Sequence, residues 1–61
     1  FGLKPITESL GIESAGMIVA YPPGIPILMP GEIIENDDID FIANNYEIIE
    51  GIVDGKLPVI P

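Results

Sequence analysis

The sequence predicts a small α+β domain in which short strands surround a corner rich in proline and glycine, with one amphipathic helix behind it. Three observations lead to this fold class. Residues 21–32 read YPPGIPILMPGE, so proline and glycine fix much of the backbone there. An apolar, β-branched run precedes this segment, and an acidic segment with apolar residues at helical spacing follows it. With 61 residues, the chain has room for one domain at most.

Strands are predicted on both sides of the corner. Residues 17–21 form a continuous apolar run bounded by Gly and Pro, which is typical of a strand buried on both faces. Residues 25–29 resume an extended course, and Pro26 cannot donate to a ladder, so this strand is an edge strand or begins after Pro26. Residues 1–9 are expected to be extended. For residues 52–61 the sequence predicts a strand, a two-residue turn at Asp-Gly and an extended tail.

A helix is predicted from about residue 38 to residue 50. Asp37 is the expected N-cap, with Asp40 three residues on as a weaker relative of the capping box. Gly51 is a natural residue to follow the last helical turn. One apolar face recurs at helical spacing and is made by Ile39, Ile42, Ala43, Tyr46 and Ile49.

The corner itself consists of two turns joined by a short apolar run. Proline fixes φ near −65°, and a glycine after it can take the positive φ that a type II turn requires. The second turn comes directly before Glu32 and so fixes the direction of this carboxylate, while Tyr21 stands just before the first turn. The residues predicted to build the corner are Pro22, Pro23, Gly24, Pro26, Pro30 and Gly31.

Composition limits the kinds of partner. The formal charge is −8, from ten acids against Lys4 and Lys56, which argues against nucleic acid and against an anionic membrane surface. No apolar run approaches the roughly 18 residues of a membrane span. Without Cys or His the chain has no disulfide and no imidazole ligand, and the missing cysteines favour the cytoplasm. Since 48% of the residues are hydrophobic, we expect part of the apolar surface to pack on something outside this chain.

Few residues are candidates for chemistry. Ser14 has no His or Lys neighbour to activate it and is interpreted as structural. The acids around residue 37 lack the spacing of a calcium loop, so a solvated helix cap is the preferred interpretation and no metal is expected. No glycine-rich phosphate loop is present. Glu32 is the acid to single out, because a carboxylate held by a rigid corner could bind an ammonium or guanidinium group; an ordinary exposed glutamate at a strand end is the alternative.

A second function is compatible with the same residues. The segment PPGIP at residues 22–26 could act as a polyproline ligand of an aromatic-lined partner. The chain would then be a free-standing acidic interaction module that uses its proline-rich corner. Against this, such ligands are usually disordered and exposed, whereas this segment is flanked by Ile, Val, Leu and Met.

The run MIVAYPPGIPILMPGE at residues 17–32 closely resembles a signature in the C-terminal domain of the Orn/Lys/Arg decarboxylases. These are the fold-type I, pyridoxal-phosphate-dependent decarboxylases of basic amino acids. The family pattern has a small-residue lead-in, then Y-P-P-G-I/V-P, a short apolar run, P-G-E and two aliphatics. Residues 10–15 resemble the lead-in, and the resemblance extends over roughly residues 5–52.

The resemblance implies that residues 1–61 are a single C-terminal domain, or a fragment of one, from a larger decarboxylase whose N-terminal and large pyridoxal-phosphate domains are absent from this chain. A chain that starts at Phe1 and stops at Pro61 is then expected to be an excised or processed piece. The parent would be an oligomeric, cytoplasmic lyase of polyamine biosynthesis. It would release CO2 from arginine, lysine or ornithine to give agmatine, cadaverine or putrescine.

The resemblance also implies what this chain does within the parent. Lys4 and Lys56 lie in nothing like the family's Ser-x-His-Lys motif, so the chain alone should neither bind pyridoxal phosphate nor catalyse a reaction. Its implied role is to pack on the large domain and to help wall the active site at the dimer interface. Tyr21 and Glu32 are the residues expected nearest to the basic substrate.

Overall fold

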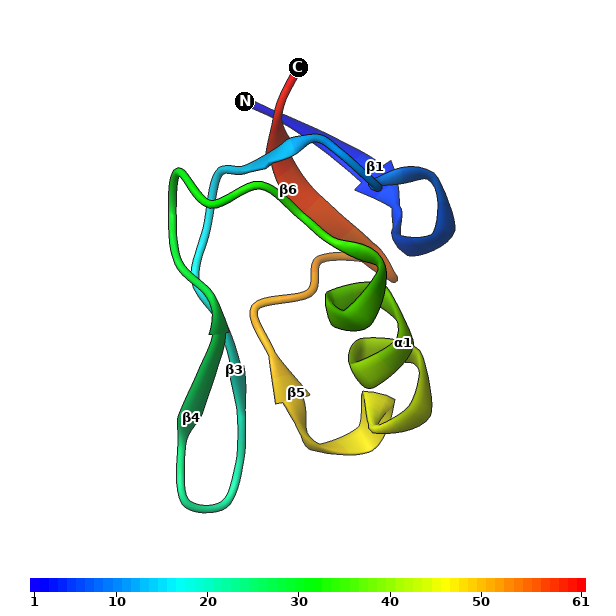
Figure 1. Cartoon of the computed structure of the whole chain (residues 1–61). Coiled ribbons are helices and arrows are strands. Elements are labelled where there is room, and N and C mark those ends of the chain that lie inside the picture. Colours follow the sequence, from blue (N-terminus) through cyan, green and yellow to red (C-terminus); the bar gives the residue numbers. More distant parts are fainter.

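The chain forms two small antiparallel sheets with one α-helix beside them, as seen in a computed structural model that describes all residues 1–61 (Figure 1). One sheet has the strand order β1-β6-β2 and the other the order β4-β3-β5. The predicted α+β class is therefore confirmed. The elements are β1 (Gly2–Pro5), η1 (Ile6–Glu8), β2 (Glu13–Ser14), β3 (Ile18–Ala20), β4 (Ile25–Leu28), α1 (Asn36–Asn44), η2 (Tyr46–Ile48), β5 (Ile49–Glu50) and β6 (Lys56–Ile60), where η denotes a 3-10 helix.

The first sheet joins the two ends of the chain. β6 lies in its centre, with β1 paired from Gly2 opposite Val59 to Pro5 opposite Lys56, and with β2 on the other side. The termini consequently lie close together (Figure 1). The Asp-Gly turn predicted before β6 is also present. Val53 and Lys56 exchange two backbone hydrogen bonds of 2.9 Å across it, and Asp54 has a φ of 52°.

The second sheet contains the hairpin predicted around the corner. β3 is its central strand, and all three of its residues are buried, as expected for a strand covered on both faces. β4 pairs with β3 through an irregular register between Ile18 and Val19. β4 is an edge strand that pairs only with β3, which confirms the expectation for a strand that contains Pro26.

The helix ends earlier than predicted. α1 stops at Asn44, the chain continues through one 3-10 turn, and Ile49 then enters β5 opposite Ala20. The prediction of a helix to residue 50 was therefore wrong in its last part, and Tyr46 is half-exposed instead of facing the core. The physical reason is tertiary: residues 44–46 are weak helix formers, and pairing with β3 decides where Ile49 goes.

The helix also begins before the predicted cap. Glu35 is the N-cap, and its N–H donates to the Asp38 carboxylate at 2.9 Å in a capping box. The assignment of Asp37 as the cap, with Asp40 as its partner, was wrong by two residues. The reciprocal acid pair explains the difference, because Glu35 and Asp38 have the three-residue spacing that lets the second side chain reach back. No helix in the fold has the length and apolar character that crossing a bilayer requires.

A single core connects the two sheets with the helix. It contains aliphatic side chains from four strands (β3, β4, β5 and β6) and from α1, together with Ile34 from the segment before the helix. All of these side chains are buried, and fully burying a Leu or Ile side chain stabilises a fold by about 1.5–3 kcal/mol relative to leaving it exposed. The core residues are Ile18, Ala20, Leu28, Ile34, Ile39, Ile42, Ile49, Leu57 and Val59.

Gly51 allows the closest approach between the segments of this core. Its φ is 109°, and a Cβ atom added there would overlap the Met17 carbonyl oxygen and lie 3.0 Å from Ile18 Cδ1. The expectation that Gly51 ends the helix was wrong, because the helix stops at Asn44. The residue instead follows β5 and lets the chain turn against the start of β3.

We predict that Gly51→Ala destabilises the chain by roughly 2–3 kcal/mol, because it combines a positive φ with a backbone overlap. Urea unfolding followed by circular dichroism measures this. Gly2→Ala is the matched control, because its added Cβ would meet no atom within 4 Å and its φ is not positive. Equal midpoints for Gly51→Ala and the unsubstituted chain would contradict the assigned role of Gly51.

Candidate functional site

The residues singled out from the sequence lie along one hairpin and the turn that follows it. Tyr21 comes directly after β3, the prolines of the first turn form the tip, and the second turn follows β4. In Figure 1 this hairpin lies beside β5, on the side opposite α1, and its tip points away from the sheet that holds the termini. The peptide bonds preceding Pro22 and Pro23 are both cis. Because the fold contains no pocket, the candidate site lies on the surface of this hairpin.

Tyr21 is fixed through its backbone and its ring. The Tyr21 N–H donates to the Ile48 carbonyl oxygen at 2.8 Å, which extends the contact between β3 and β5. Gly24 has a φ of 106°, and a Cβ atom there would lie 3.0 Å from Tyr21 Cε1, so the ring rests against this glycine. The positive φ predicted for Gly24 is confirmed. The side-chain hydrogen bonds of the fold do not include the Tyr21 hydroxyl, which can therefore meet a group outside the chain.

Glu32 closes the second turn. Its N–H donates to the Met29 carbonyl oxygen at 3.1 Å, and its carboxylate accepts the Met29 N–H at 2.7 Å. Gly31 between them has a φ of 94°, as a type II turn with Pro30 before it requires. The turn is anchored to the backbone of β2: the Ser14 N–H donates to the Glu32 carbonyl oxygen, and the Ser14 carbonyl oxygen accepts from the Gly31 N–H, both at 2.8 Å.

The Glu32 carboxylate is thus held in place and still exposed. One oxygen, Oε1, accepts the turn N–H, and the carboxylate retains further acceptor positions for an external donor. The surrounding charge is strongly negative, with ten acids against two lysines in the whole chain. Such a surface attracts a cationic group more than a neutral or anionic one.

Tyr21 and Glu32 do not meet within the chain. Tyr21 lies at the tip of the hairpin, whereas Glu32 lies beyond its open end. The four residues of β4 between them correspond to roughly 13 Å of extended strand. Any site that includes both residues would therefore span the length of the hairpin and need further groups from outside this chain.

The two lysines do not form a site for pyridoxal phosphate. Lys4 lies in β1 opposite Leu57, and Lys56 is exposed after the Asp-Gly turn. The fold contains no pocket around either amine. A cofactor of this type needs an amine in an enclosed cavity together with donors for its phosphate, and the residues present do not fit it.

The remaining candidates have structural surroundings. The Ser14 hydroxyl is buried and donates to the Gly16 carbonyl oxygen at 2.8 Å, which confirms its structural interpretation. Gly16 itself approaches Pro58, whose Cγ would be 2.9 Å from an added Cβ. Two of the acids at the start of α1, Glu35 and Asp38, form the capping box, and no three acidic side chains of the fold converge on one point.

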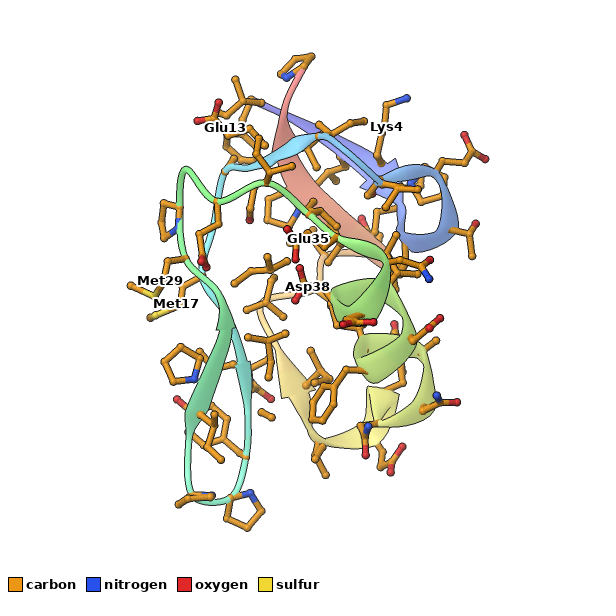
Figure 2. The ribbon with its side chains drawn as sticks, in the orientation of Figure 1. Lys4, Glu13, Met17, Met29, Glu35 and Asp38 are labelled. Carbon is orange, nitrogen blue, oxygen red and sulfur yellow. The ribbon has the colours of Figure 1, made fainter.

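The structure adds two residues that sequence reasoning did not single out. Met17 and Met29 lie side by side at the open end of the hairpin, with side chains directed away from α1 (Figure 2). Their proximity follows from the pairing of Ile18 with Leu28, which places the residues just outside this pair opposite each other. The signal in the sequence that could have pointed to this apolar pair is the absence of any charged residue from position 15 to position 31.

Comparison with known proteins identifies the class to which this fold and hairpin belong. The family model for the Orn/Lys/Arg decarboxylase C-terminal domain matches residues 4–52. The chain belongs to this family, which confirms the resemblance noted in the sequence.

Several curated proteins are similar to the chain. It is 39% identical over 59 residues to the arginine decarboxylase of Bacillus subtilis (strain 168), covering 92% of this chain and 12% of that protein. It is 49% identical over 41 residues to the arginine decarboxylase of Halalkalibacterium halodurans, covering 67% and 8%. It is 47% identical over 46 residues to the inducible lysine decarboxylase of Escherichia coli (strain K12), covering 70% and 6%. The chain thus spans only a small part of the length of these relatives.

We predict that Glu32→Ala weakens the second turn and destabilises the chain by about 0.5–1.5 kcal/mol, the usual net value of a hydrogen bond. Glu32→Gln should cost less, because its amide oxygen can still accept the Met29 N–H. Urea unfolding of both variants measures the difference. An equal loss of stability in the two variants would show that the side-chain oxygen is not what closes the turn.

Proposed function

We propose that this chain serves as the C-terminal domain of a pyridoxal-phosphate-dependent decarboxylase of basic amino acids. In that enzyme it packs on the large cofactor-bearing domain and contributes to the wall of the active site where subunits meet. The observation that carries the proposal is the family match over residues 4–52, which includes the complete hairpin and its second turn. The names of the similar proteins, arginine and lysine decarboxylase, support a basic substrate.

The cofactor and the catalytic amine belong to the rest of the enzyme in this proposal, because Lys4 and Lys56 do not fit pyridoxal phosphate. The cofactor supplies the electron sink for loss of CO2. This chain supplies rigid positioning and negative charge. The product would be the amine that remains after loss of CO2: agmatine from arginine, cadaverine from lysine or putrescine from ornithine.

Two residues have assigned roles toward the substrate. Glu32 would accept hydrogen bonds from the distal ammonium or guanidinium group through the acceptor positions that the turn leaves free. Tyr21 would offer its exposed hydroxyl and the edge of its ring from the tip of the hairpin. Because they lie at opposite ends of the hairpin, we assign them separate contacts instead of one shared site.

Reconstitution tests the proposed function. Production of this chain together with the remaining polypeptide of the decarboxylase, supplied with pyridoxal phosphate, should release CO2 from arginine or lysine. Neither part alone should do so. Release at the full rate by the remaining polypeptide alone, or no release and no complex when both parts are present, would contradict the proposal.

The role of Glu32 is tested in the complete enzyme. We predict that Glu32→Gln raises KM for the basic amino acid roughly tenfold, since one charge-assisted hydrogen bond is worth about 1.5 kcal/mol or more. The turn should persist in this variant, so the change would report the lost charge. Glu8→Gln in η1 is the matched control, because it removes an exposed acid from an element that lies beside α1. Equal KM values for the two variants would exclude substrate contact by Glu32.

A further inference from the structure

The β3–β4 hairpin is an uncharged arm on a highly charged chain. Residues 15–31 contain no Asp, Glu, Lys or Arg, although these types make up 20% of the chain. Four large apolar side chains of this segment are about half-exposed: Met17 at 50%, Tyr21 at 49%, Ile25 at 55% and Met29 at 45%. An uncharged segment with this much exposed apolar surface is characteristic of an interface.

The methionine pair gives the open end of the hairpin a continuous apolar surface. Met17 and Met29 lie next to each other and point away from the helix (Figure 2). Thioether side chains are flexible and polarisable, so a neighbouring pair can fit an irregular apolar groove. Ile25 near the tip is also exposed, and we call these three side chains, Met17, Ile25 and Met29, the docking surface.

Several other exposed apolar side chains in the fold have a different setting. Phe41 follows Asp40, Tyr46 precedes Glu47, and Val53 precedes Asp54. Each of these rings or aliphatic groups therefore has an acid as its direct neighbour in the chain. Burying such a position in an interface would also bury or displace a charge, which is costly. The hairpin can be covered without this cost, although Phe1, Leu3, Leu10 and Ile60 are also exposed and have no acid beside them in the chain.

The charge of the chain argues against a second copy as the occupant. With a formal charge of −8 on each chain, two copies repel each other. Pairing of edge strands is also restricted, because Pro26 lies in the edge strand β4 and removes a donor. The partner must instead contact side chains, and it must tolerate or neutralise the acids that border the hairpin.

Those acids lie at two sides of the docking surface. Glu32 follows the open end, next to Met29, and Glu50 lies in β5 opposite Val19. Both are exposed. A matching partner therefore has an apolar groove without charges in its floor and with Lys or Arg at its rim. The similar decarboxylases are many times longer than this chain, which covers 12% of the Bacillus subtilis protein, so we take the remaining polypeptide of such an enzyme as the partner.

We propose that the β3–β4 hairpin is the arm by which this domain docks, and that Met17, Ile25 and Met29 enter an apolar, basic-rimmed groove on the remaining decarboxylase polypeptide. This inference rests on the proposed function and specifies which face performs the packing. In this arrangement the surface of α1, which carries acidic side chains, remains exposed to solvent.

Photo-crosslinking in the complete decarboxylase tests the docking arm. The photoreactive residue p-benzoylphenylalanine replaces Met29 in one variant and Leu10 in the control variant. Leu10 is 58% exposed and lies away from the hairpin. We expect irradiation to join position 29, and not position 10, to a peptide of the remaining polypeptide that has Lys or Arg beside an apolar stretch. Mass spectrometry identifies the peptide, and decarboxylation before irradiation verifies folding.

Each other outcome overturns the inference in a distinguishable way. A cross-link from position 10 alone would leave the packing in the proposed function intact but exclude the hairpin as its face. No cross-link from either position would contradict the packing itself. A cross-link between two hairpins would show that a second copy is the occupant, and an acidic peptide would exclude the basic rim. If the Met29 variant fails to fold, the same label at Ile25 decides between these results.

Discussion

The pairing of β3 with strands on both sides holds the fold together. β3 brings the hairpin, contributed by β4, next to the segment that follows the helix, contributed by β5. Ile18 and Ala20 from this strand join the same core as the helix residues Ile39 and Ile42. The approach at Gly51 allows β5 and the start of β3 to come this close. Because these contacts are shared, the position of the hairpin and the end of the helix are set together.

Local sequence signals were sufficient where neighbouring residues determine the structure. The buried strand, the edge position of Pro26 and the Asp-Gly turn followed from residue types within a few positions. The helix end did not, because it depends on a strand far away in the sequence. Ile49 fits the helical spacing and also fits a strand, and only its partner Ala20 decides between these states.

The candidate site shows the same division between local and distant information. The turn around Glu32 could be predicted from Pro30 and Gly31, and the resemblance to the family singled out Tyr21 and Glu32. Their separation along the hairpin could not be predicted, because it depends on how β4 pairs with β3. The methionine pair was missed for this reason too: twelve positions separate Met17 from Met29 in the chain, and the register alone places them together.

The hairpin is both uncharged and conformationally restricted, and the charged residues lie in the rest of the chain. This combination suits a contact between domains of one enzyme. The charged residues all lie outside residues 15–31, so the hairpin can lose water without burying a charge. The prolines and the hydrogen bond from Met29 to Glu32 already restrict its backbone, so little conformational freedom remains to be lost when it docks. An arm with this preorganisation suits a permanent contact between domains of one enzyme better than recognition of varied partners. The negative charge on the rest of the surface then favours basic groups at the edge of that contact, whether they belong to the neighbouring domain or to the substrate.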